Sequence, residues 1–196
     1  EKNYLIAAYL FDETELKKYM RKNQEEQLVT GLLYLDNYEE ALESVEEVRS
    51  SLLIALIDRK INKYFASIDG VVKKLEKDKY FLVMRRKSLE QLKEKKFNIL
   101  EEVKSVNIGN EMAVTISIGI GINADSYAHT SESARIAMEL ALGRGGDQVV
   151  IKDGNNITYF GGKSQMMEKT TRVKARVKAH ALKEFMSSKD KIVVMG

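Results

Sequence analysis

Val29-Thr-Gly-Leu-Leu-Tyr-Leu-Asp-Asn-Tyr38 is a nearly continuous apolar run that turns polar at Asp36. A short apolar run between polar segments is typical of a strand buried on both faces. The run therefore predicts a buried strand over Val29–Leu35. Asp36 then follows directly at the carboxyl end of that strand.

A β-hairpin is predicted further along the chain. Its strands are expected at Ile68–Leu75 and Tyr80–Met84, and the turn at Glu76-Lys-Asp-Lys79. Two helices, expected at Tyr38–Val48 and Ser50–Phe65, separate the first strand from this hairpin. The first half of the chain thus predicts the order β-α-α-β-β.

The second half continues this alternation. The pattern predicts a helix over Ser88–Val106, a strand over Met112–Ile122, a helix over Ser131–Leu142, and a last hairpin from Val149–Lys152 and Ile157–Phe160. The order indicates an α+β fold with one mixed, mostly antiparallel sheet and helices on both faces. The order resembles the ferredoxin-like core, with additions, that nucleotide cyclases and polymerase palms share. In that plan the ligand is expected at the end of the first strand and at the central hairpin turn.

Composition excludes several classes of protein. The 196 residues are 44% hydrophobic and 31% charged, as in a globular domain. There is no cysteine, so disulfides and thiolate metal sites are excluded. The net charge of +3 is too small to indicate a nucleic-acid partner, and we expect none. No apolar run reaches the roughly 20 residues of a membrane span.

Both ends of the chain look like parts of other domains. The chain begins at Glu1, without a methionine, and ends in the strand-like Lys191-Ile-Val-Val-Met-Gly196. A lone strand has nothing to pair with unless its sheet lies elsewhere. We therefore expect a piece of a longer protein.

Five short segments form a pattern through their order and spacing. They are Leu33-Tyr-Leu-Asp-Asn-Tyr38, Lys74-Leu-Glu-Lys-Asp-Lys-Tyr80, Val114-Thr-Ile-Ser-Ile-Gly119, Ala134-Arg-Ile-Ala-Met-Glu-Leu-Ala141 and Gly145-Gly-Asp-Gln-Val-Val150. Together they resemble the GGDEF family of diguanylate cyclases over roughly residues 27–160. The resemblance implies a fold of the nucleotide-cyclase type.

Several residues depart from what that family uses. The signature Gly-Gly-Asp/Glu-Glu-Phe falls on Glu76-Lys-Asp-Lys-Tyr80, which retains only the metal-binding acid, Asp78. Tyr34 stands where the first metal carboxylate belongs, and Leu42 where an Asn reads guanine. The inhibitory Arg-x-x-Asp falls on Ser67-Ile-Asp-Gly70 and is absent. We therefore expect no diguanylate cyclase activity.

The remaining polar residues predict a degenerate nucleotide site. Asp36 and Asp78 are the expected metal ligands, for Mg²⁺ or Mn²⁺, because these cations prefer carboxylate oxygens. Lys77 and Lys79 are the expected phosphate contacts, and the resemblance implies ATP with weak ATPase activity. All four residues also suit a solvated strand end and turn. Gly143–Asp147 indicates a helix C-cap, with a phosphate-binding turn as the alternative.

A narrower resemblance involves the last third of the chain. It is carried by Ala141-Leu-Gly-Arg-Gly-Gly-Asp-Gln-Val-Val-Ile-Lys152, Tyr159-Phe-Gly-Gly-Lys163 and Thr171-Arg-Val-Lys-Ala-Arg-Val-Lys-Ala-His-Ala-Leu182. These segments resemble GdpP/YybT-type membrane phosphodiesterases, which join two membrane helices, a PAS domain, a degenerate GGDEF domain and a DHH domain that hydrolyses cyclic di-AMP with Mn²⁺.

The resemblance implies a division of the chain into five parts. These are the end of a PAS domain (1–11), a signalling helix (12–27), the degenerate GGDEF domain (28–161), a basic linker helix (162–188) and the first strand of a truncated DHH domain (189–196). The helix is expected to begin with Asp12 as N-cap and Glu15 completing a capping box. The basic helix is expected to be a solvated linker, with nucleic-acid or lipid contact as the alternative.

The implied partners follow from this arrangement. We expect a nucleotide, the PAS and DHH domains of the same protein, and a second copy of the chain, which the charged helix Glu13–Gln27 would contact. The piece would lie on the cytoplasmic side of a bacterial plasma membrane. A purely structural spacer that only dimerises is the alternative function.

Overall fold

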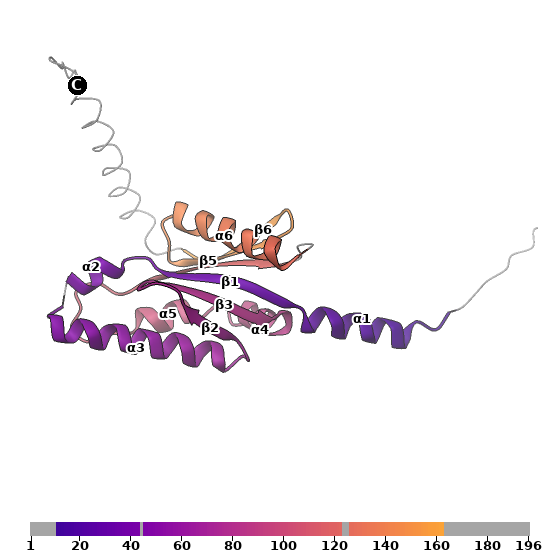
Figure 1. The fold of residues 1–196 in the computed structure, drawn as a ribbon, viewed down its shortest axis with the longest axis horizontal. Coiled ribbons are helices and arrows are strands. Elements are labelled where there is room, and N and C mark those ends of the chain that lie inside the picture. Colours follow the sequence, from indigo (N-terminus) through magenta and orange to yellow (C-terminus); the bar gives the residue numbers. More distant parts are fainter. Residues whose placement is uncertain (1–10, 44, 123–125, 163–196) are drawn as a thin grey trace, which may run out of the picture.

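The fold is one sheet with helices on both faces (Figure 1). The computed structural model describes residues 11–43, 45–122 and 126–162. After helix α1 (Thr14–Glu26) come β1 (Leu28–Leu35), α2 (Tyr38–Glu43), α3 (Glu47–Ala66), β2 (Val71–Lys74), β3 (Lys79–Arg85), α4 (Arg86–Glu94), α5 (Ile99–Lys104), β4 (Ile116–Ile122), α6 (Tyr127–Gly143), β5 (Gln148–Asp153) and β6 (Asn156–Gly161).

The six strands lie in the order β2-β3-β1-β4-β5-β6. Every neighbouring pair is antiparallel except β4 and β5, which are parallel. A parallel pair needs a crossover, and α6 supplies it. Helix α6 covers one face of the sheet, and α3, α4 and α5 lie on the other (Figure 1). The predicted α+β fold with a mixed, mostly antiparallel sheet is confirmed.

Strand β4 shows how its sequence divides the two faces. Ile116, Ile118 and Ile120 are fully buried in the main core, together with apolar residues of α3, α4 and α5. Gly119 and Gly121 alternate with them, and a Cβ atom at either would overlap the backbone of α6. The alternation therefore packs large side chains on one face and brings a helix backbone against the other.

The predicted helix over Ser88–Val106 is wrong in one respect, because it is divided into α4 and α5. Lys96 and Phe97 have positive φ angles of 49° and 52° between the two helices. Phe97 is thereby turned into the core, where its ring centroid lies 5.0 Å from that of Phe160. Burial of this aromatic side chain outweighs the local preference for a continuous helix.

Two other predicted boundaries also differ. Helix α6 begins at Tyr127 rather than Ser131, because Ser126 caps it by accepting a hydrogen bond from the His129 amide at 3.2 Å. Strand β4 begins at Ile116 rather than Met112. The amide side chain of Asn37 binds the backbone of residues 113 and 115 and so takes the place of a neighbouring strand.

The break between α2 and α3 and the start of α1 also differ from the prediction. Helix α2 ends at Glu43 and α3 begins at Glu47, so the break precedes the expected one.

The predicted capping box at the start of α1 is wrong, since α1 begins at Thr14 after Glu13, which makes no side-chain cap. Asp12, two residues before the helix, instead accepts a hydrogen bond at 2.9 Å from the amide of Thr14, the first residue of α1.

Parts of the expected domain division lie outside the described residues. The expected PAS end falls mostly within residues 1–10, which the structure does not describe. The basic helix, apart from its first residue, and the whole DHH strand fall within residues 163–196, which it does not describe either. Within the described ranges, no helix is both long and apolar enough to cross a membrane.

Candidate nucleotide and metal site

Backbone hydrogen bonds tie the end of β1 to the β2–β3 turn. The Leu35 amide donates to the carbonyl of Asp78 at 2.9 Å, and the Asp36 amide donates to the carbonyl of Thr115 at 2.9 Å. The first bond joins the residue before Asp36 to Asp78 itself. The two predicted metal ligands are thus held at the same edge of the sheet, although they are far apart in sequence.

A cavity of about 340 Å³ lies at this edge, and we call it the strand-end cavity. It is lined by Leu35, Asp36, Tyr38, Glu39, Glu40, Lys77 and Asp78. Three of the four predicted site residues, Asp36, Lys77 and Asp78, are therefore brought together. Glu39 and Glu40, in the first turn of α2, add two carboxylates that sequence reasoning did not single out.

Lys79, the fourth predicted residue, does not line the cavity. Its ammonium binds the Glu76 carboxylate at 2.6 Å and lies 5.7 Å from the centre of the Tyr34 ring. The hydrogen bond to Glu76 raises the pKa of Lys79 above its usual value. The substitutions at the first and fourth signature positions thus form an ion pair with each other.

Asp36 is held by two donors from the protein. One carboxylate oxygen accepts from the Ser117 hydroxyl at 2.6 Å, and the other accepts from the Asp147 amide at 2.8 Å. Each oxygen keeps a second lone pair. The orientation of Asp36 is therefore fixed before any ligand arrives.

The Asp147 amide belongs to the glycine turn after α6. Gly145, Gly146 and Asp147 all have positive φ, and the Gly146 amide closes the helix end by donating to the carbonyl of Ala141 at 3.0 Å. The predicted helix C-cap is confirmed. The turn also binds an anion, since the Asp147 amide donates to the carboxylate of Asp36.

A buried ion pair supports this turn from below. The Asp147 carboxylate, only 2% exposed, lies 2.7 Å from the ammonium of Lys104 in α5. Lys104 also lies 2.9 Å from Glu101. Burial lowers the pKa of Lys104, but the hydrogen bonds to Asp147 and Glu101 outweigh it and raise the pKa. Sequence reasoning missed Asp147 and Lys104; an acid directly after two glycines that end a helix is the signal for the first.

The residues of the cavity fit a divalent cation shared with phosphates. Among the described residues, no three acidic or histidine side chains form a group that could hold a metal ion by themselves. Mg²⁺ in nucleotide sites is commonly bound by one or two carboxylates together with substrate phosphates and water. Asp36 and Asp78 meet that requirement.

The remaining positions of the family pattern have structural roles. Leu42, at the position of the guanine reader, is half-buried and packs against the core. Tyr80, the last signature position, is buried, and its hydroxyl donates to Asp58 in α3. Burial and that carboxylate raise the pKa of Tyr80. Asp58 also receives a hydrogen bond from Lys74, so the hairpin is fastened to α3 through one carboxylate.

Solved GGDEF domains share this architecture. The GGDEF domain of DgcB from Caulobacter crescentus aligns with a TM-score of 0.54 and 17% identity over 71% of this chain and 84% of that one. The GGDEF domain of PA1120 from Pseudomonas aeruginosa gives 0.56 and 18%, over 73% and 94%. Identities this low show the fold alone.

The sequence is more similar to bacterial cyclic-di-AMP phosphodiesterases. It is 38% identical to GdpP of Geobacillus thermodenitrificans, 35% to PdeA of Listeria monocytogenes and 33% to GdpP of Bacillus subtilis. Each match covers 96% of this chain but only 29% of the relative. Residues 33–159 also match the family described as "Cyclic-di-AMP phosphodiesterase GdpP-like, GGDEF domain". The chain belongs to this family of GdpP-like GGDEF domains.

Proposed function

We propose that this domain binds a nucleoside triphosphate such as ATP, together with Mg²⁺ or Mn²⁺, in the strand-end cavity. In this proposal, binding regulates a cyclic-di-AMP phosphodiesterase domain in the same protein. The observation that carries the proposal is that Asp36, Lys77 and Asp78 line one cavity. The relatives named as cyclic-di-AMP phosphodiesterases support the regulated activity.

The charges of the cavity explain why a cation would be needed. Four carboxylates and one ammonium line it, so a bare triphosphate would be repelled. A divalent cation between Asp36 and Asp78 would neutralise these two carboxylates and offer a positive centre to the phosphates. Lys77 would then contact a phosphate, while Lys79 would do so only after leaving Glu76. The bound cation would also supply the charge stabilisation that slow hydrolysis of ATP needs.

Calorimetry on the 196-residue chain tests the site. ATP is titrated with Mg²⁺, with Mn²⁺, and with EDTA in place of metal. We expect metal-dependent binding that Asp78→Asn weakens at least tenfold, since it removes a charged ligand and keeps the shape. Glu94→Gln, a change of the same kind on an exposed helix residue, is the control. The proposal fails if the native chain gives no binding heat with either metal.

Cyclase activity is not part of the proposed function. Glu76 and Lys77 replace two glycines whose backbone would approach a phosphate, and Tyr34 replaces a metal carboxylate. Leu42 packs against the core and offers no group to a guanine edge. We therefore expect no cyclic di-GMP from GTP, measured by chromatography after prolonged incubation. Phosphate release from ATP, by contrast, is expected to be slow but measurable.

The rest of the proposed protein lies outside this chain. The chain spans 29% of the length of the relatives it matches. We propose that the remainder includes a PAS domain, membrane helices and a Mn²⁺-dependent DHH domain, with this domain on the cytoplasmic side of the plasma membrane. This regulation is tested by measuring cyclic-di-AMP hydrolysis by the full-length protein with and without ATP. Asp78→Asn should abolish the effect of ATP.

The exposed apolar face of α1 supports a second candidate, a spacer that dimerises. This helix has no buried residue, and Leu16, Tyr19 and Met20 expose more than half of their surfaces at helical spacing. A second copy of the helix would cover them. Leu16→Lys with Met20→Lys should then halve the mass measured by ultracentrifugation. If Asp36→Asn with Asp78→Asn leaves regulation of the full-length enzyme unchanged, the spacer function is favoured over nucleotide binding.

A further inference from the structure

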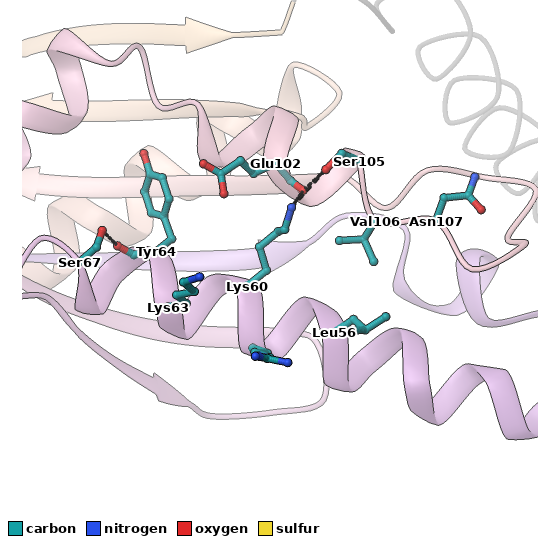
Figure 2. Close-up of a pocket in the computed structure, with 10 residues that line it drawn as sticks. Leu56, Lys60, Lys63, Tyr64, Ser67, Glu102, Ser105, Val106 and Asn107 are labelled. Carbon is teal, nitrogen blue, oxygen red and sulfur yellow. Dashed lines mark hydrogen bonds between the residues drawn. The ribbon is translucent and has the colours of Figure 1, made fainter.

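A second hollow, of about 650 Å³, lies between helices α3 and α5, and we call it the helix groove. Figure 2 shows it with its lining side chains. They are Leu56, Arg59, Lys60, Lys63, Tyr64, Ser67, Glu102, Ser105, Val106 and Asn107. The volume is that of a site for a small molecule, and none of these residues lines the strand-end cavity.

The groove is basic because three cationic side chains and a single carboxylate line it. Arg59, Lys60 and Lys63 lie within little more than one turn of α3, and Glu102 is the carboxylate. The Glu102 carboxylate itself accepts a hydrogen bond from the side-chain amide of Asn98 at 2.9 Å. The positive charge is therefore largely uncompensated within the groove.

Lys60 is fixed across the groove. Its ammonium donates to the carbonyl of Glu102 at 2.8 Å and to the Ser105 hydroxyl at 3.2 Å, as Figure 2 shows. An ammonium has three donors, so one remains for a ligand. Lys60 thus joins α3 to α5 and leaves a donor within the groove.

Arg59 and Lys63 are not engaged in this way. They are four residues apart, which places them on the same side of α3. Within the described parts of the chain, neither makes an ion pair or a side-chain hydrogen bond with another residue, and both are exposed. Several other cations of the described structure are paired with carboxylates, as Lys74 is with Asp58. Two neighbouring unpaired cations beside a fixed ammonium are an arrangement that favours a multiply charged anion.

The other walls define what the anion would be attached to. Leu56 and Val106 give the groove an apolar end, and the ring of Tyr64 borders it, with its hydroxyl held by Asn98 at 2.7 Å. Burial, followed by the nearby Glu102 carboxylate, raises the pKa of Tyr64 to about 12, so the hydroxyl is neutral at physiological pH. A ligand with phosphates at one end and a flat or apolar group at the other would match this distribution.

From this groove we infer a second ligand site, for a small molecule that carries two or more phosphate groups and binds without a metal ion. Arg59 and Lys63 contact the phosphates, and Lys60 supplies the remaining donor. The site is independent of the proposed metal–nucleotide site, because its charges are already complementary to phosphate. It therefore takes its ligand under conditions in which the strand-end cavity takes none.

The inference is tested by calorimetry, in which pyrophosphate is titrated into the 196-residue chain in the presence of EDTA. We expect binding in the native chain that Arg59→Gln with Lys63→Gln weakens at least tenfold. The control, Lys73→Gln with Lys95→Gln, removes two charges from exposed lysines outside the groove and should change the affinity less than twofold. Both variants alter exposed side chains, so each should fold, and thermal melts check this.

A second arm tests the other end of the ligand. ATP in EDTA should bind more tightly than pyrophosphate if the apolar end takes a base, and this gain should fall with Leu56→Ser. The inference is overturned if neither pyrophosphate nor ATP binds at millimolar concentration. It is also overturned if the groove variant and the control variant weaken pyrophosphate binding equally. Because EDTA removes the cation that the strand-end cavity needs, neither result depends on the proposed nucleotide function.

Discussion

The two hollows of this domain carry opposite charge. Four carboxylates and one lysine line the strand-end cavity, whereas three cationic side chains and one carboxylate line the helix groove. Under the two proposals, a phosphate ligand needs a cation to enter the first and none to enter the second. Position on one sheet fold would then separate metal-dependent from metal-free anion binding.

Helix α5 connects the two regions. Lys104, which also binds Glu101, pairs with Asp147, and the Asp147 amide supports Asp36 at the strand-end cavity. Glu102 and Ser105, between and after them, hold Lys60 at the helix groove. One short segment thus supports both sites through different residues. A variant at Lys104 reports on the strand-end cavity, and a variant at Ser105 reports on the helix groove.

The largest expected effect comes from the buried ion pair. Asp147→Asn keeps a residue type that tolerates positive φ but removes the charge that Lys104 faces. We expect the free energy of unfolding to fall by about 3 kcal/mol, since one partner of a buried pair is lost. Urea denaturation measures this. Pyrophosphate binding in EDTA should be unchanged. A loss below about 0.5 kcal/mol, which is the scatter of surface variants, would contradict the supporting role.

A smaller effect is expected on the groove side. Lys60→Met keeps the aliphatic stem but removes the hydrogen bonds to Glu102 and Ser105. The unfolding free energy should fall by about 1 kcal/mol, because the ammonium is only partly buried. Lys63→Met is the matched control, with no such bond in the described structure, and should cost less than about 0.5 kcal/mol. Equal losses for the two variants would show that Lys60 does not join the helices.

The charge contrast itself can be weakened from the acidic side. Glu39→Gln with Glu40→Gln removes two exposed carboxylates from the strand-end cavity. Repulsion of the triphosphate falls, so affinity for ATP with Mg²⁺ should rise about threefold at this cavity. Calorimetry in an Arg59→Gln, Lys63→Gln background isolates the effect. An unchanged affinity would mean that these carboxylates do not control entry.

The smallest expected effect is a pH dependence at the groove. The pKa of Tyr64 is raised to about 12 from the 10.0 of a free side chain. The raised pKa contributes stability below pH 10 that is lost as the pH rises toward 12, because the unfolded state releases the proton first. The stability difference between the native chain and Tyr64→Phe should therefore narrow over this range in urea denaturation. A constant difference would contradict the shifted pKa.

Local patterns were sufficient for most of the fold. Apolar runs and glycine positions predicted all six strands, since burial and turns determine them directly. The sequence predicted a mixed sheet but did not assign the parallel pair to β4 and β5. The division between α4 and α5 was not predictable, because it depends on Phe97 meeting Phe160 more than 60 residues later. The early end of the β4 pairing depends in the same way on Asn37.

The site was predictable only in part. Asp36, Lys77 and Asp78 meet in one cavity because the sheet topology, which the sequence predicted, brings the end of β1 to the hairpin turn. Their roles with metal and nucleotide stay predictions. The Lys79–Glu76 pair and the support of Asp36 by Asp147 depend on side-chain geometry that spacing does not specify. The helix groove had no sequence motif, because charges on α3 resemble any solvated helix until α5 faces them.

The two glycines of β4 have a consequence for sequence variation. Because a Cβ atom at Gly119 or Gly121 would overlap the backbone of α6, main-chain atoms set the height of that helix above the sheet. Main-chain atoms are the same whatever side chains α6 carries. The outer residues of α6 can therefore diverge freely between homologues while the turn after the helix keeps the Asp147 amide against Asp36. Substitutions on the outer face of α6 should therefore leave the geometry of the strand-end cavity unchanged.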